Sequence, residues 1–132
     1  MYLLDTDVLI ELTRGNAPVQ ERLALVGLDH CAISEISLAE LYVGYYKNHK
    51  RLEPLFAFLE ASITTLPISS AIKTYAQLRA RLESEGKRLD NMDLLIGATA
   101  LANDCTLVTH NTQHFARIQG LKLEDWMNNE SA

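Results

Sequence analysis

Short apolar runs alternate with longer amphipathic segments along this chain, and this alternation limits the possible fold more than any other feature. We predict strands at residues 2–5, 30–34, 63–67 and 105–109, with a further edge strand at 121–126. Helices are expected at 6–15, 17–27, 34–47, 50–62, 69–86, 90–104 and 112–118. Strands that alternate with helices pair in parallel through right-handed crossovers. The pattern therefore predicts an α/β three-layer sandwich, with a central parallel sheet of four to five strands, helices on both faces, and a single domain over residues 1–132.

The composition excludes some classes of protein. The formal net charge of −5 excludes a generally basic nucleic-acid binder, so any contact with nucleic acid needs a local basic patch. Cys31 and Cys105 lie in separate apolar runs without a metal-binding or redox spacing, and we expect both to be buried free thiols. The N-terminus lacks the pattern of a secretory leader and no apolar run has the length of a membrane span. We therefore expect a cytoplasmic protein with no membrane partner.

Acidic residues follow the predicted strands and suggest a metal site. Asp5 closes the apolar run "YLLD", and Asp7 follows two residues later. Open α/β sheets bind ligands beyond the carboxyl ends of their strands, where the strand order reverses. A carboxylate held rigidly at such an end suits a hard cation such as Mg²⁺, but one carboxylate alone binds it weakly. Glu40, after the second strand, and Asp93, at the start of the helix over 90–104, could converge on the same edge.

Helix capping offers a simpler explanation for three of these acids. Glu40 could form a capping box with Ser37 in "SLAE". Asp90 and Asp93 could favour the dipole of the helix that they begin, and Asp7 could be a first-turn acid of the helix over 6–15. Asp5, which ends the first strand, has no such alternative except as the residue that precedes a Thr6 cap. Spacing alone leaves both explanations open for the other three.

Three stretches of the chain together form a larger pattern: "LLDTDVLIEL", "ISEISLAELYVG" and "LDNMDLLIGATALANDCTLVTHNTQHFARIQGLKLEDW". In their order and spacing they resemble the PIN-domain family, and in particular the VapC-type toxin ribonucleases of bacterial toxin–antitoxin systems. The resemblance extends from Leu3 to Trp126. It implies that Asp5, Glu40 and Asp93 are the catalytic residues and that the same three carboxylates bind the metal.

The resemblance also implies an activity and its partners. Members of the family are Mg²⁺-dependent endoribonucleases, with Mn²⁺ as a possible substitute, that hydrolyse RNA phosphodiester bonds with a metal-activated water. They act as the toxin of a toxin–antitoxin pair and are usually dimers. We therefore expect a cognate small antitoxin protein, a homodimer and an RNA substrate, with tRNA as one candidate. Residues that would orient carboxylates, water or substrate are Thr6, Asp7, Thr109 and Asn111.

The chain departs from the family pattern at three positions. Asn111 is neutral where many members carry a fourth acid, which weakens any expectation of four acidic ligands. Asp7 stands where Asn or Ser is common, so it could add a carboxylate to the site or simply begin a helix. Gly97 stands where Ala is usual, a change from one small residue to another.

Several basic residues could contact RNA phosphates despite the acidic net charge. Lys87, Arg88 and Arg117 lie close in sequence to the proposed site residues and are candidate phosphate contacts. Arg79 and Arg81 are instead expected on a solvated helix face.

Two other functions compete with the ribonuclease. One is a PIN-like module that binds RNA or protein without cutting it, although the presence of all three acids argues against it. The other is a phosphatase similar to haloacid dehalogenases, in which Asp5 of "DTDVL" would be the nucleophile and Asp7 the general acid. That family's pattern is met only in part, because Leu9 holds its last position and no convincing catalytic lysine follows.

Overall fold

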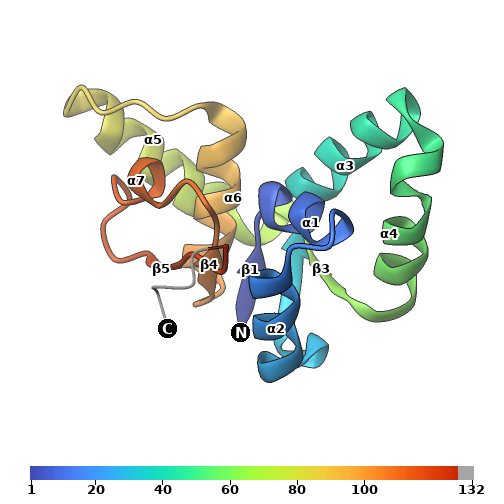
Figure 1. Cartoon of the computed structure of the whole chain (residues 1–132). Coiled ribbons are helices and arrows are strands. Elements are labelled where there is room, and N and C mark those ends of the chain that lie inside the picture. Colours follow the sequence, from blue (N-terminus) through green and yellow to red (C-terminus); the bar gives the residue numbers. More distant parts are fainter. Residues whose placement is uncertain (128–132) are drawn as a thin grey trace.

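A five-stranded parallel sheet forms the centre of the molecule (Figure 1). The computed structural model describes residues 1–127, without the side chains of residues 60 and 61. The strands lie in the order β3-β2-β1-β4-β5, and all four neighbouring pairs are parallel. Their bounds are β1 Tyr2–Leu4, β2 Cys31–Ser34, β3 Thr64–Leu66, β4 Thr106–Val108 and β5 Lys122–Glu124. The predicted parallel sheet, including its edge strand, is confirmed.

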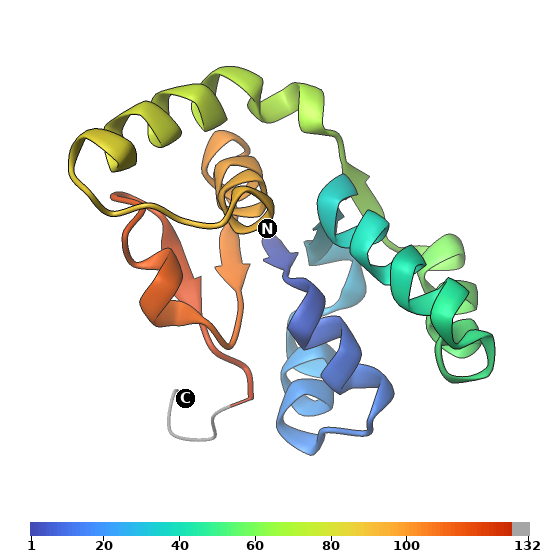
Figure 2. The ribbon, with the colours of Figure 1, turned by 90° about the horizontal axis from the view of Figure 1, so that it is seen from above.

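Helices cover both faces of the sheet, as Figure 2 shows from above. The α-helices are α1 Thr6–Thr13, α2 Ala17–Val26, α3 Glu35–Lys47, α4 His49–Ser62, α5 Ile72–Ser84, α6 Asn91–Ala102 and α7 Thr112–Phe115. Two 3₁₀ turns, η1 Leu28–His30 and η2 Ile68–Ala71, join them to the strands. The predicted three-layer α/β sandwich is therefore confirmed. No helix in residues 1–127 is both long and apolar enough to cross a membrane.

Successive residues of the strands contribute to two hydrophobic cores, one on each face of the sheet. Leu3 and Leu107 point into the core under α5, α6 and α7. Leu4 and Val108, their neighbours in sequence, point into the core under α1, α2 and α4. Because side chains alternate between faces along a strand, a strand of three residues can anchor both layers. Both cysteines are buried and free, as the sequence predicts.

Most of the predicted helices are shorter in the structure than in the sequence-based prediction, and two of them show why. The helix expected over 69–86 begins only at Ile72, because Ser70 donates its hydroxyl to the Pro67 carbonyl and shapes the turn η2 instead of capping a helix. The helix expected over 112–118 ends at Phe115. Beyond it, the amide of Ile118 bonds to the carbonyl three residues earlier, which tightens the chain into turns.

The contact between Gly97 and Ile118 gives a testable consequence for stability. A Cβ at Gly97 would lie 2.5 Å from Cδ1 of Ile118 and 3.4 Å from Cδ1 of Phe115, and both neighbours are buried. Gly97→Ala is therefore expected to lower the free energy of unfolding by about 1–3 kcal/mol through overpacking. The better helix propensity of alanine would offset about 0.5–1 kcal/mol of this loss. Urea denaturation would measure the difference.

Ile118→Val provides the matched control for this prediction, because it removes the Cδ1 atom that the new methyl group would meet. In a double-mutant cycle, Gly97→Ala should cost less in the valine background than in the wild type. Equal costs in the two backgrounds, or a stabilising effect of alanine alone, would show that the contact does not limit this position.

Candidate active site

The sheet order reverses between β1 and β4, and a cleft opens there beyond the carboxyl ends of the strands. Its volume is about 400 Å³. The lining residues are Asp5, Thr6, Asp7, Ile10, Glu11, Arg14, Glu40, Asp93, His110, Asn111 and Met127. The three acids predicted to converge thus line one cleft, although they come from β1–α1, α3 and α6. We call it the acidic cleft.

Asp5 is fixed at the end of β1 by bonds to both of its carboxylate oxygens. Its Oδ1 accepts a hydrogen bond from the backbone N of Thr6 at 2.8 Å, so Asp5 is the N-cap of α1, and the expectation that capping does not account for this residue is wrong. Its Oδ2 accepts one from Oγ1 of Thr109, also at 2.8 Å. Only 5% of Asp5 is exposed, so the sheet and two threonines hold the carboxylate rigidly.

Glu40 is held toward the acidic cleft from α3. Thr6 donates its hydroxyl to Oε1 of Glu40 at 2.7 Å, across 34 residues of sequence. The capping box considered with Ser37 is wrong, because Ser34 is the N-cap of α3 and accepts the amide of Ser37 at 3.0 Å. Glu40 lies farther along the helix, where capping does not explain it.

Asp93 stands in the first turn of α6, whose N-terminal end lies at the carboxyl edge of the sheet. Asp90 caps this helix and accepts hydrogen bonds from the amides of Met92 and Asp93 at 3.1 and 3.4 Å. The capping explanation therefore holds for Asp90 and leaves the carboxylate of Asp93 to line the cleft.

Asp7 occupies the first turn of α1, between the acidic cleft and the segment after β4. Its Oδ2 accepts the backbone amide of His110 at 3.1 Å. Its Oδ1 is buried and has no hydrogen-bond partner among the described residues. A buried carboxylate oxygen without a donor is costly, and a bound cation or water would satisfy it.

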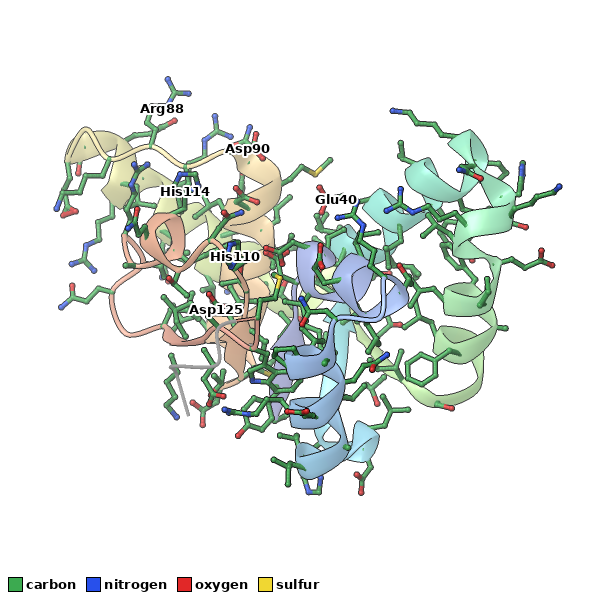
Figure 3. All side chains as sticks on the ribbon, in the orientation of Figure 1. Glu40, Arg88, Asp90, His110, His114 and Asp125 are labelled. Carbon is green, nitrogen blue, oxygen red and sulfur yellow. The ribbon has the colours of Figure 1, made fainter. Side chains whose placement is uncertain are left out.

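The segment after β4 completes the floor of the cleft. The Thr109 hydroxyl, which is fully buried, accepts the amide of Asn111 at 3.1 Å while it donates to Asp5. Asn111 is exposed and lines the cleft. Figure 3 shows Glu40 and His110 near the start of α1, one on α3 and the other after β4. His110 also contacts Asp125, and its Nδ1 lies 3.1 Å from Oδ2 of that residue.

Burial and mutual repulsion push these carboxyls toward the protonated form. Burial raises the pKa of Asp5 to about 7, and the carboxylate of Asp7 adds to the rise, whereas hydrogen bonds from Thr109 and Thr6 oppose it. The pKa of Asp7 is raised by burial, against hydrogen bonds from backbone amides. Burial, followed by the nearby Asp90 and Glu40, raises the pKa of Asp93. A cation bound in the cleft would favour the ionised carboxylates and so lower these pKa values.

The donor set suits a hard divalent cation. Mg²⁺ and Mn²⁺ prefer carboxylate, carbonyl and water oxygens, and Mg²⁺ commonly binds through one or two carboxylates while keeping several waters. Within residues 1–127, no three histidine, cysteine, aspartate or glutamate side chains already surround one point closely enough to hold an ion. For all three acids to contact one ion, the carboxylates of Glu40 and Asp93 would have to lie closer to Asp5 than they do here.

Sequence reasoning missed Ile10, Glu11, Arg14 and Met127, which also line the cleft. Glu11 and Arg14 form an ion pair at 2.8 Å on its rim, and Met127 reaches it from the far end of the chain. Asp7, Glu11 and Arg14 are spaced i, i+4 and i+7, so one face of α1 could have been predicted to line the site. No sequence signal points to Met127.

The candidate phosphate contacts lie outside the acidic cleft. Lys87 and Arg117 line a separate groove, together with Arg81, which was expected on a solvated helix face. Arg88 points elsewhere and lies 3.8 Å from Glu83. Arg79 pairs with Glu83 at 3.2 Å, as expected for an exposed helix face.

Comparisons with known proteins agree with this architecture. The family model of the PIN domain matches residues 2–121. Ribonuclease VapC2 of Rickettsia felis is 35% identical over 96% of this chain and 98% of its own length. The tRNA(fMet)-specific endonuclease VapC of Shigella flexneri is 32% identical, with 95% and 97% covered.

Solved structures give the same result. The DNA-bound VapBC complex of Salmonella typhimurium contains a chain with a TM-score of 0.86 and 28% identity, covering 95% of this chain and 97% of that one. VapBC2 of Rickettsia felis bound to a promoter DNA fragment gives a TM-score of 0.84 and 32% identity, covering 95% and 98%. The phosphatase alternative gains no support from these matches. The chain therefore belongs to the PIN-domain family, among proteins of the VapC type.

Proposed function

We propose that this protein is a divalent-metal-dependent endoribonuclease and the toxin of a toxin–antitoxin pair. The observation that carries the proposal is the convergence of Asp5, Glu40 and Asp93 on one cleft at the switch point of the sheet. Relatives that are at least 30% identical over nearly the whole chain are named ribonucleases or endonucleases. The binding-module alternative would not explain why the buried Asp5 is placed so close to the like-charged Asp7 and Asp93.

Asp5, Glu40 and Asp93 would hold the ion, Mg²⁺ or in its place Mn²⁺. When bound, such an ion acts as a Lewis acid toward the phosphodiester and lowers the pKa of water. Thr109 and Thr6 donate hydrogen bonds to Asp5 and Glu40 and so orient the two carboxylates toward the cleft where the ion would bind. Asp7 and Asn111 face the same cleft and would orient water or substrate.

The direct test is a cleavage assay on tRNA and total RNA with protein freed of any co-purified antitoxin. We expect cleavage with Mg²⁺ or Mn²⁺ and none in excess EDTA. Restored cleavage after Mg²⁺ is added back would exclude damage by the chelator. If folded protein binds RNA but does not cut it under any of these conditions, the binding-module function would replace the one proposed.

Removing the Thr109 hydroxyl tests whether the positioning of Asp5 matters. Thr109→Val keeps the shape but removes the donor to Asp5 and the acceptor for Asn111. We expect cleavage to fall about 10–100-fold, as for other residues that orient metal ligands. The free energy of unfolding should fall by about 1–3 kcal/mol because a buried amide or carboxylate loses its partner.

Thr99→Val is the matched control, since this buried hydroxyl bonds only to the Leu95 carbonyl of its own helix among the described contacts. It should lower stability without a specific loss of cleavage by the remaining folded protein. Equal losses of cleavage in the two variants at a temperature where both are folded would argue against a positioning role for Thr109.

Assembly with a small antitoxin and with a second copy of the chain also belongs to the proposal. The structural neighbours are toxin–antitoxin complexes, some of them bound to DNA. Exposed apolar side chains on α3, namely Tyr42, Val43 and Tyr46, offer surface for a protein contact. Light scattering of the purified chain, alone and with the protein encoded beside it, would test both expectations.

A further inference from the structure

The acidic cleft by itself repels RNA. Five carboxylates line it against one guanidinium, that of Arg14, which is already paired with Glu11. A bound cation would neutralise only part of this charge. Binding to nucleic acid depends mainly on cations that neutralise phosphates. If the protein cleaves RNA as proposed, the strand must be held by basic residues outside the cleft.

A second cavity, of about 560 Å³, lies between the end of α5 and α7. It is lined by Arg81, Glu85, Lys87, Gln113, Ala116, Arg117 and Gln119, and we call it the basic groove. Three cations and one carboxylate face it, in a chain whose net charge is −5. The basic groove is therefore a local patch of the kind that an acidic protein needs for contact with nucleic acid.

The backbone around α5 and α7 brings these cations together. Gly86, with φ +68°, ends α5 in a conformation that favours glycine, and the amide of Lys87 then bonds back to the Leu82 carbonyl at 2.8 Å. Arg117 donates from Nη1 to the carbonyl of Arg88 at 2.7 Å, which ties the loop before α6 to the end of α7. The groove is thus built from three segments that fix one another.

The side chains of the groove are available to a ligand. Among the described residues, the Lys87 ammonium has no ion-pair or hydrogen-bond partner, and the side chain is exposed. Arg81 pairs with Glu85 at 3.6 Å and contacts Gln119, but its guanidinium is half exposed. Such exposed pairs contribute little to stability, so a phosphate can exchange with the carboxylate at small cost.

The basic groove and the acidic cleft lie on opposite ends of one short segment. Asn111 lines the cleft, and Gln113 and Arg117 line the groove. Gln113 and Arg117 follow Asn111 by only two and six residues, and the short helix α7 lies between them. Figure 3 shows His114, on α7, between Arg88 and His110 in this view. A single strand of RNA could therefore occupy both places.

We propose that the basic groove is a phosphate-binding subsite for the RNA strand whose scissile bond enters the acidic cleft, with Arg81, Lys87 and Arg117 as the contacts. This proposal rests on the ribonuclease function proposed above. The chemistry of the lining favours a phosphate backbone over a protein segment. Of the lining residues in the described part of the chain, Ala116 alone is apolar, and a protein helix or strand would need apolar anchors.

The test is RNA binding without cleavage. Fluorescence anisotropy in EDTA would follow a labelled tRNA and a labelled single-stranded RNA over a series of salt concentrations. The double variant Arg81→Gln/Lys87→Gln should bind single-stranded RNA about tenfold more weakly at low salt. The slope of log K against log salt should become less steep by about 1.4 if two phosphate contacts are lost. Circular dichroism and thermal unfolding would check the fold.

Lys50→Gln/Lys73→Gln is the matched control, because it removes two exposed positive charges outside the groove. It should leave both the affinity and the salt slope close to those of the wild type. Equal weakening in both double variants would show that net charge, not the groove, governs binding and would overturn the proposal. Loss of antitoxin affinity with unchanged RNA binding would overturn it in favour of a protein-docking surface.

This experiment distinguishes a failure of the proposed phosphate-binding subsite from a failure of the proposed ribonuclease function. Wild-type protein that binds RNA through the groove but never cuts it would contradict the proposed function and leave the subsite intact. Wild-type protein that cuts RNA while the groove variant binds and cuts equally well would contradict the subsite alone.

Discussion

Asp5→Asn is expected to lower metal-dependent RNA cleavage by about 10³-fold, the largest effect on activity of any single substitution considered. Asparagine keeps the size of the side chain and an oxygen for the hydrogen bond from Thr6. It removes the negative charge of the proposed metal ligand that is most buried and that Thr109 holds in place. Initial cleavage rates on tRNA at saturating Mg²⁺ would measure the loss.

Asp29→Asn is a suitable control, because Asp29 is highly exposed and lies outside the acidic cleft. It changes the net charge equally and should leave cleavage unchanged. Near wild-type cleavage by folded Asp5→Asn protein would remove Asp5 from the metal site. A similar loss in both variants would attribute the effect to overall charge.

The second large effect is a loss of stability with rising pH in metal-free protein. The unfolded chain releases the Asp5 proton near pH 3.8, whereas the folded chain keeps it to about pH 7. The folded state therefore binds more protons between these values, and the free energy of unfolding falls as pH rises through this window. Asp5 alone would contribute a fall of up to about 4 kcal/mol. The raised pKa values of Asp7 and Asp93 act in the same direction.

Urea denaturation in EDTA at pH 5 and pH 8 would measure the larger part of this fall, about 3 kcal/mol for Asp5 alone. Asp5→Asn should reduce the difference between the two pH values and should be more stable than the wild type at pH 8, because it removes a buried charge. Added Mg²⁺ should stabilise the wild type at pH 8 more than the variant. Equal wild-type stability at both pH values, or a variant less stable at pH 8, would contradict the account of the electrostatics.

The fold could be predicted from local patterns because the spacing of apolar residues differs between its helices and its strands. The strand over 2–5 and the helix after it were recognisable from a few residues each, and parallel pairing followed from their alternation. The turn at η2 was not, because the Ser70 hydroxyl could serve either a helix cap or the Pro67 carbonyl. Local sequence does not decide between two acceptable partners for one hydroxyl.

The candidate site was likewise predictable from the sequence only in part. The positions of Asp5 and Glu40 at one edge followed from the direction of parallel strands. The bond from Thr6 to Glu40 and the meeting of Gly97 with Ile118 join distant parts of the sequence, and no short pattern encodes them. The grouping of Arg81 with Lys87 and Arg117 also depends on how α7 packs beside α5.

The proposed metal site places Asp5, Glu40 and Asp93 around one divalent cation. Anomalous diffraction from crystals of the protein grown with Mn²⁺ would test it most directly. We predict a manganese peak in the acidic cleft, contacted by Asp5 and by at least one of Glu40 and Asp93, with those two side chains turned inward. A cleft without manganese at saturating concentration, or manganese bound only elsewhere, would contradict the claim and leave these carboxylates without the role proposed for them.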